Sequence, residues 1–256
     1  MILKLNEKEF IDTDAPIDIS IPIHNGKNPV LAWYYGPIEL TPVMTDQFIG
    51  DVNQGGAVNF RHLSMNPHAH GTHTECVGHI SKEWYSINKC LKTFHFKAAL
   101  ITVVPAKVFN DEFQKEDDVV QVEAIKEAID NLDLPQDVDA LVIRTMPNGI
   151  NKLSKNYSST NPIYYDEACI HFINDLGIKH LIVDLPSVDR EEDKGVLAAH
   201  HAFWDYPNNP QLEKSITELV FIPDEVKDGI YVANIQITSL ENDASPSKVV
   251  LFKIQS

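Results

Sequence analysis

The sequence has little of what disulfide scaffolds, secreted proteins or membrane proteins need. Its 256 residues include three cysteines, Cys76, Cys90 and Cys169, and none forms a C-x-x-C pair. An odd number of cysteines without such spacing indicates reduced thiols and favours a cytoplasmic location. Residues 1–10 lack the uninterrupted apolar stretch of a signal peptide, and no apolar run is long enough for a transmembrane helix. We therefore expect a soluble cytoplasmic protein.

Positive charge is also scarce. The chain has 21 Lys and Arg against 37 Asp and Glu, which gives a formal net charge of −16. Nucleic acids and anionic membranes bind basic surfaces, so neither is expected as a partner. The sequence has no G-x-S-x-G elbow and no phosphate-binding loop, which excludes serine hydrolases of that type and nucleotide-binding proteins. A small-molecule substrate is compatible with these observations.

Hydrophobic residues make up 43% of the chain and fall into short runs that favour an α/β protein. Six β-branched runs predict strands: Ile17–Ile23, Ala98–Val104, Ala140–Thr145, His180–Leu185, Ile230–Ile237 and Val249–Ile254. Two segments, Val119–Leu132 and Tyr165–Leu176, have the three- and four-residue apolar spacing of helices. No repeat or linker interrupts the chain, so we predict one domain over residues 1–256. The segment Met146–Asn161 is rich in turn formers, and a binding loop and a plain surface loop are both compatible with it.

The most informative segment is His68–His79, which contains four of the eleven histidines and one glutamate. Imidazole is the commonest metal ligand and titrates near neutral pH, so this density predicts a metal or catalytic site. In an extended segment alternate side chains share a face, which would place His73, Glu75 and His79 together. His73 and Glu75 would lie about 7 Å apart and could bind one ion. His79, further along that face, would act as a general base.

This segment resembles the signature His-x-Gly-Thr-His-x-Asp-x-Pro-x-His of the metal-dependent cyclase family, which includes bacterial kynurenine formamidases. Gly71-Thr72-His73, then Glu75 and His79, fall on matching positions, with Glu75 in place of the family's bridging aspartate. The resemblance extends over most of the chain. It implies a swivelling β/β/α domain, with a central barrel-like mixed sheet flanked by helices. It also places His200 and Glu218 where the family has its later metal ligands, and Trp33 where it has an aromatic pocket residue.

One family ligand is missing, because the first histidine of the signature falls on Ala69. His68 and His70 flank this position, and either could replace the ligand. A one-residue β-bulge would turn His68 toward the site, so His68 is the favoured substitute. A second alternative concerns the later histidine, since His201 adjoins His200 and could exchange roles with it; His200 is favoured.

The resemblance implies hydrolysis of an amide-type C–N bond, with N-formylkynurenine-like aryl formamides as substrates and a place in tryptophan catabolism. The implied ligands of one or two Zn²⁺ or Mn²⁺ ions per subunit are His68, His73, Glu75, His200 and Glu218. In the implied reaction His79 would transfer the proton to the leaving amine, while Trp33 and Tyr34 would contact the substrate. Two alternatives remain: hydrolysis of a cyclic amide or lactone, such as an isatin-like ring, and a non-catalytic metal- or ligand-binding protein. Family members also imply a homodimer or homotetramer.

Overall fold

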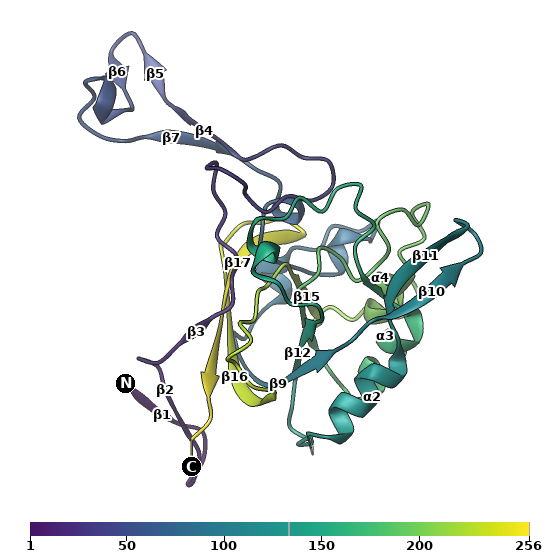
Figure 1. The fold of residues 1–256 in the computed structure, drawn as a ribbon. Coiled ribbons are helices and arrows are strands. Elements are labelled where there is room, and N and C mark those ends of the chain that lie inside the picture. The colour runs from purple at the N-terminus through teal and green to yellow at the C-terminus, as the bar shows by residue number, and fades with distance from the viewer. Residues whose placement is uncertain (133, 256) are drawn as a thin grey trace.

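A closed, barrel-like sheet forms the centre of the computed structural model, which describes residues 1–132 and 134–255 (Figure 1). Within these residues the strand order is β16-β9-β12-β14-β15-β8-β17, and pairing of β16 with β17 closes the ring. The strands are β8 (His73–Glu75), β9 (His95–Val103), β12 (Ala140–Thr145), β14 (His180–Val183), β15 (Ser215–Glu218), β16 (Gly229–Ile237) and β17 (Ala244–Lys253). Strands β9, β12, β14 and β15 are parallel and the other pairings are antiparallel, so the sheet is mixed.

The sequence predicts the central strands well because they are buried on both faces. All residues of β12 and β14 are buried, as expected for parallel strands covered on both sides. The strand predicted over Ile17–Ile23 is shorter, with β3 limited to Ile17–Asp18 at the edge of β17. One reason is that the backbone N–H of Ile21 donates to the Thr72 hydroxyl instead of to a neighbouring strand.

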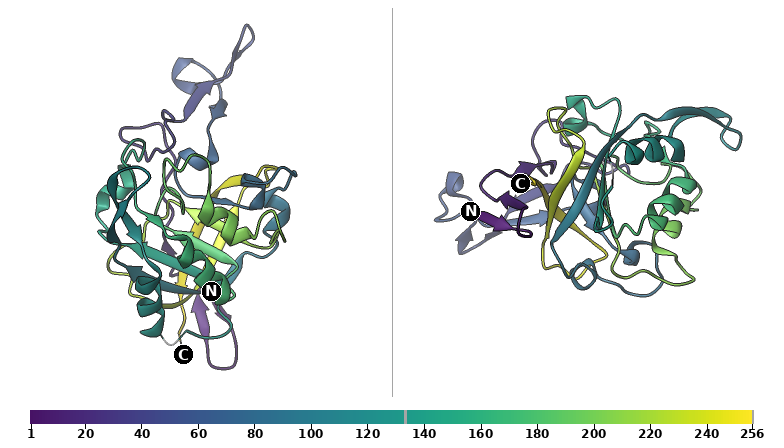
Figure 2. Two further views of the ribbon diagram at one scale, coloured as in Figure 1. Left: turned by 90° about the vertical axis from the view of Figure 1, so that its right-hand side faces the viewer. Right: turned by 90° about the horizontal axis from the view of Figure 1, so that it is seen from below.

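Helices α2 (Val122–Asp130), α3 (Glu167–Asp175) and α4 (Ala198–Trp204) lie on one side of the barrel, as Figure 1 and the right-hand view of Figure 2 show. Their apolar side chains pack on one face of the central strands, and a second core cluster occupies the opposite face. Both predicted helices begin later than expected. Val119 and Val120 belong to β11 (Lys115–Val120), which pairs with β13 (Tyr164–Tyr165) and gives these residues strand partners. The α/β class with a central barrel-like mixed sheet and flanking helices is confirmed.

Smaller elements extend from this body. A two-stranded arm, β4 (Glu39–Pro42) with β7 (Arg61–Ser64), projects away from the barrel and carries the β5 (Met44–Thr45) and β6 (Phe48–Ile49) hairpin at its tip (Figure 1). The other elements are β1 (Ile2–Lys4), β2 (Phe10–Asp12), β10 (Ala106–Asn110), α1 (Ile87–Cys90), and the 3₁₀ helices η1 (Val52–Gln54), η2 (Pro67–Ala69), η3 (Val77–His79) and η4 (Ile150–Ser154). None of the described helices has the length and apolar character needed to cross a membrane. The single domain stays a prediction.

Candidate metal centre

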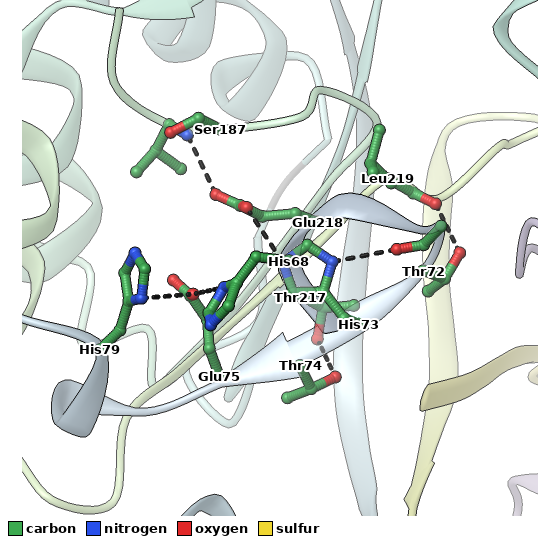
Figure 3. Close-up of polar contacts among 12 residues, drawn as sticks. His68, Thr72, His73, Thr74, Glu75, His79, Ser187, Thr217, Glu218 and Leu219 are labelled. Atoms are coloured by element: carbon green, nitrogen blue, oxygen red, sulfur yellow. Dashed lines mark hydrogen bonds and ion pairs between the residues drawn. The ribbon is translucent and has the colours of Figure 1, made fainter. Parts of the chain in front are cut away.

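Strands β8 and β15 place three of the predicted site residues next to one another. His73 lies directly opposite Glu218 in the antiparallel register, and Glu75 is two residues further along β8 on the same face. His73 Nε2 lies 3.3 Å from Glu218 Oε2, and all three side chains are buried. Figure 3 shows these side chains facing one another, with His68 and His79 beside Glu75. The pleat of a single strand pair therefore builds the base of the site.

The turn before β8 fixes the orientation of the His73 ring. Gly71 has a φ of +113°, a conformation that favours glycine, and its carbonyl lies 3.0 Å from His73 Nδ1. A proton on Nδ1 would be donated to this carbonyl, which leaves the lone pair of Nε2 directed toward Glu218. This is the arrangement commonly seen for a metal-binding histidine, whose second nitrogen is held by an acceptor.

His68 reaches the site by a different route from the predicted β-bulge. Pro67–Ala69 form the 3₁₀ helix η2, capped by Asn66, whose side-chain oxygen accepts the His68 backbone N–H at 3.0 Å. Asparagine at the N-cap followed by proline favours a helical turn, so the bulge prediction is wrong. In this turn His68 Nδ1 lies 3.1 Å from Glu75 Oε2.

His70 and Ala69 lie away from the candidate ligands. The two ring nitrogens of His70 are 2.8 Å from the carbonyls of Asn66 and Gly36, and Tyr35 packs edge-on against the ring. Ala69 is completely buried. Of the two histidines that flank Ala69, the structure brings only His68 to Glu75.

His79 also reaches the site through a helical turn. The extended face predicted to continue from Glu75 to His79 ends at Glu75, because Val77–His79 form the 3₁₀ helix η3. A β-carbon at Gly78 would lie 2.2 Å from the Tyr85 carbonyl, so the turn depends on glycine at this close approach. Val77 packs into the core, while His79 Nδ1 lies 3.8 Å from Glu75 Oε2.

The second half of the chain contributes His200 from α4. Its Nε2 lies 3.2 Å from Glu75 Oε1, and its Nδ1 is hydrogen-bonded to the carboxylate of Asp189. Asp189 also accepts the backbone N–H groups of Ala199 and His200 and so caps the start of α4. His201 faces away, with its Nδ1 2.8 Å from the Tyr206 carbonyl. The structure brings His200, and not His201, into the cluster.

The carboxylates and histidines of the site shift one another's pKa values. Burial would raise the pKa of Glu75, but the positive charge of His79 and hydrogen bonds from His200 and His68 bring it well below its usual range. Burial would lower the pKa of His68, but hydrogen bonds to Asp243 and Glu75 raise it to about 10. The buried acids therefore require positive charge, which either protonated histidines or a bound cation would supply.

The donor atoms fit a divalent cation. His73 Nε2 is buried and makes no hydrogen bond among the described residues, and Glu218 Oε2 lies 3.3 Å from it. Two groups of possible ligand atoms lie within 4.8 Å of one another, His68–Glu75–His79 and His73–Glu75–Glu218, and Glu75 belongs to both. Imidazole and carboxylate donors without thiolates suit Zn²⁺ or Mn²⁺.

A cavity of about 350 Å³ opens beside these groups. Its walls include Trp33, Ser187 and Arg190, together with His68, His79, His200 and Glu218. Tyr34 is not among the lining residues; its side chain is 63% exposed, and its backbone N–H donates to the Ser158 hydroxyl. Of the two aromatic residues predicted to contact a substrate, the structure brings Trp33 alone to the cavity wall.

Sequence reasoning missed the functional potential of Asp243. Its Oδ2 lies 2.8 Å from His68 Nε2 and 3.4 Å from His79 Nδ1. A lone aspartate in a turn between two strands carries no recognisable signal, and it is 175 residues from His68 in the chain. Only the closing of the barrel brings these side chains together.

Comparison with known proteins shows the family to which the chain belongs. A family model described as "Putative cyclase" matches residues 17–190. A kynurenine formamidase of Bacillus cereus is 29% identical over 242 residues, which cover 93% of this chain and 98% of the relative.

Solved structures with the same fold include a potential metal-dependent hydrolase with cyclase activity, with a TM-score of 0.62 and 18% identity over 93% of this chain and 97% of the other. An isatin hydrolase bound to the product analogue thioisatinate gives a TM-score of 0.64 and 10% identity, covering 93% of this chain and 92% of the other. The predicted family resemblance is confirmed. Since the family model spans more than half of the sequence, the chain belongs to the putative cyclase family.

Proposed function

We propose that this protein is a metal-dependent hydrolase that cleaves an amide-type C–N bond in a small arylformamide. The observation that carries the proposal is the convergence of His68, His73 and His200 on the carboxylates of Glu75 and Glu218. Each of these three rings has one nitrogen near an acceptor and the other directed toward a glutamate. Side chains arranged in this way suit a cation better than an ordinary buried salt-bridge network.

These five residues would hold one or two Zn²⁺ or Mn²⁺ ions. A divalent cation supplies Lewis acidity, which polarises a carbonyl and makes water easier to deprotonate. The protein itself supplies the ligand geometry and the buried surroundings. Glu75 would be the central carboxylate among these residues, since its Oε1 faces His200 and its Oε2 faces His68.

His79 is the proposed proton-transfer residue. Its side chain is 29% exposed and lines the cavity, whereas His73 and His200 are buried. In the proposed reaction, water adds to the formyl carbon and His79 accepts a proton from it. As the C–N bond breaks, His79 donates that proton to the departing nitrogen. The products are formate and an aryl amine. A ring reached by both solvent and substrate suits this exchange.

The aryl preference rests on Trp33 and on the relatives. Trp33 forms part of the cavity wall, where its ring can stack on an aromatic substrate. The kynurenine formamidases among the relatives suggest an N-formylkynurenine-type substrate and a place in tryptophan catabolism. We also propose a homodimer or homotetramer in the cytoplasm, as the family resemblance implies.

Metal analysis combined with turnover assays tests the proposal. We expect purified protein to contain at least one equivalent of Zn²⁺ or Mn²⁺ and to release formate from N-formyl aryl amines. Removal of the metal with a chelator should abolish turnover, and adding the metal back should restore it. Isatin and a simple lactone serve as comparison substrates, and faster turnover of either would redirect the substrate assignment. Less than about half an equivalent of metal, without turnover of any substrate, would indicate a non-catalytic binding protein.

A further inference from the structure

Asp243 occupies a fixed position beside the candidate metal centre. It lies in the turn that joins β16 to β17, and its carbonyl accepts the backbone N–H of Cys76 at 3.1 Å. The neighbouring Asn242 carbonyl accepts the N–H of Ile87 at 2.8 Å, which fixes the turn a second time. The side chain of Asp243 is 23% exposed, so most of it is covered by the surrounding protein. The backbone that carries this carboxylate is therefore held in place beside the histidines.

The contacts of Asp243 complete a pattern that the other two histidines already follow. The Gly71 carbonyl faces His73 Nδ1, and the Asp189 carboxylate holds His200 Nδ1. In each case the opposite ring nitrogen faces a glutamate of the cluster. Asp243 Oδ2 stands in the same relation to His68, because it meets Nε2 at 2.8 Å while Nδ1 faces Glu75. An acceptor behind each ring sets its tautomer and increases the basicity of the nitrogen that faces a metal.

We propose that Asp243 is the positioning residue that makes His68 a metal ligand in a chain that has lost the family histidine at Ala69. The inference rests on the metal centre proposed above. With a metal bound, the N–H at His68 Nε2 would donate to Asp243, and the lone pair on Nδ1, which lies 3.1 Å from Glu75 Oε2, would be left for the metal. Direct coordination by Asp243 is disfavoured, since its carboxylate meets the side of the His68 ring that faces away from Glu75.

His68 needs this support more than its partners do. It comes from a short 3₁₀ turn with 17% of its side chain exposed, whereas His73 and His200 are buried in a strand and a helix. A partly exposed ring can rotate, and a carboxylate on its outer nitrogen removes that freedom. The same Asp243 oxygen lies 3.4 Å from His79 Nδ1, so it also limits the movement of the stacked His79 ring.

Metal affinity in a double-mutant cycle tests the inference. Zn²⁺ dissociation constants are measured by competition with chromophoric chelators for the wild type, Asp243→Asn, His68→Ala and the double variant. We expect Asp243→Asn to weaken binding by about 10- to 100-fold, as for other carboxylates that support a metal-bound histidine. Because Asp243 acts through His68, the double variant should bind no more weakly than His68→Ala alone. Glu241→Gln, an exposed residue of the same turn that pairs with Lys89, is the matched control and should keep wild-type affinity.

The outcomes separate this inference from the proposed function. Wild-type protein that binds no metal would contradict the proposed function itself. Wild-type affinity in Asp243→Asn, or losses that add in the double variant, would overturn the positioning role; additive losses would instead identify a direct ligand. Thermal unfolding of the metal-free variants checks their folding. If Asp243→Asn is destabilised, Asp243→Glu provides the second measurement, because it restores a carboxylate and should recover part of the lost affinity.

Discussion

Glu75 connects the two halves of the candidate metal centre. Its Oε1 lies 3.2 Å from His200 Nε2 and its Oε2 lies 3.1 Å from His68 Nδ1. The family signature has aspartate at this position, and the additional methylene of glutamate extends the carboxylate further from β8. A longer side chain suits a histidine that enters one residue earlier than the family's ligand. The longer side chain of Glu75 is thus consistent with the proposal that His68 replaces the ligand expected at Ala69.

The different surroundings of His73 and His79 predict different consequences when each is replaced. His73→Ala removes a buried residue that is proposed as a ligand, so this variant should lose bound metal together with activity. His79→Ala should retain the metal and lose about 10²- to 10⁴-fold in kcat, the usual contribution of a general acid–base group. Metal content and steady-state kinetics measured on the same preparations distinguish these results.

His70→Ala is the matched control, because His70 comes from the same segment but bonds to the Asn66 and Gly36 carbonyls. It should retain both metal and turnover, apart from a modest loss of stability. Full activity in His79→Ala would refute its proposed role, and metal loss in that variant would make it a ligand instead.

At the scale of elements, the loop over Met146–Asn161 is anchored by a buried ion pair. Lys152, in η4, donates from Nζ to Asp184 Oδ2 at 2.7 Å and to the Thr145 carbonyl at 2.6 Å. Asp184 follows β14 and also accepts the Thr145 backbone N–H. Both side chains of the pair are at most 8% exposed. The centre of this loop is thus attached to the ends of two central strands.

Breaking this pair should destabilise the fold. Lys152→Met leaves the Asp184 carboxylate buried without its cation, and burial already raises the pKa of this acid even with Lys152 beside it. We expect a loss of about 3–5 kcal/mol in the free energy of unfolding, measured by urea denaturation. Lys179→Met removes an exposed pair with Asp139 and should cost less than about 1 kcal/mol. Equal effects of the two substitutions would show that the buried pair does not anchor the loop.

At the scale of the whole molecule, closing the barrel places residues from distant parts of the chain in one interior. His180, the first residue of β14, is buried against the ring of Phe96 from β9, with a centroid separation of 3.8 Å. Its Nδ1 lies 2.8 Å from the Ser215 hydroxyl on β15. Burial lowers the pKa of His180 to about 4, compared with 6.5 for an unperturbed histidine. The folded barrel therefore holds this ring in its neutral form.

This burial predicts that part of the stability is lost in mild acid. As the pH falls below 6.5 the unfolded chain binds a proton at His180 that the folded chain does not, so the free energy of unfolding decreases until about pH 4. Between pH 7 and pH 5 the loss from this residue is about 2 kcal/mol. His180→Gln should lack this component, so its stability should fall by that much less over the same interval.

Urea denaturation of metal-free protein at both pH values measures the difference. His171→Gln, which replaces an exposed histidine on α3, is the control and should follow the wild type. If His180→Gln and the wild type lose equal stability between pH 7 and pH 5, the ring titrates normally in the folded state.

The features of this protein that depend on local periodicity could be predicted from its amino-acid sequence. Buried β-branched runs predicted the central strands, and apolar spacing predicted α2 and α3, although both helices begin later than expected. The alternation of side chains on β8 put His73 and Glu75 on one face, because the pleat acts over only two residues. His200 and Glu218 were identified by resemblance to the family, which carries information from a whole fold.

The routes by which the remaining groups reach the site depend on contacts that form only in the folded protein. His68 and His79 enter on 3₁₀ turns, which a capping asparagine and a close approach at Gly78 favour over the extended chain assumed from the sequence. The side chain of Tyr34 is exposed at the surface, and no local pattern in the sequence predicts this. Asp243 reaches His68 across 175 residues of chain, because pairing of β16 with β17 and of β17 with β8 sets the position of the intervening turn. Long-range strand pairing leaves no periodic signal in the sequence, so this contact was decided by barrel closure alone.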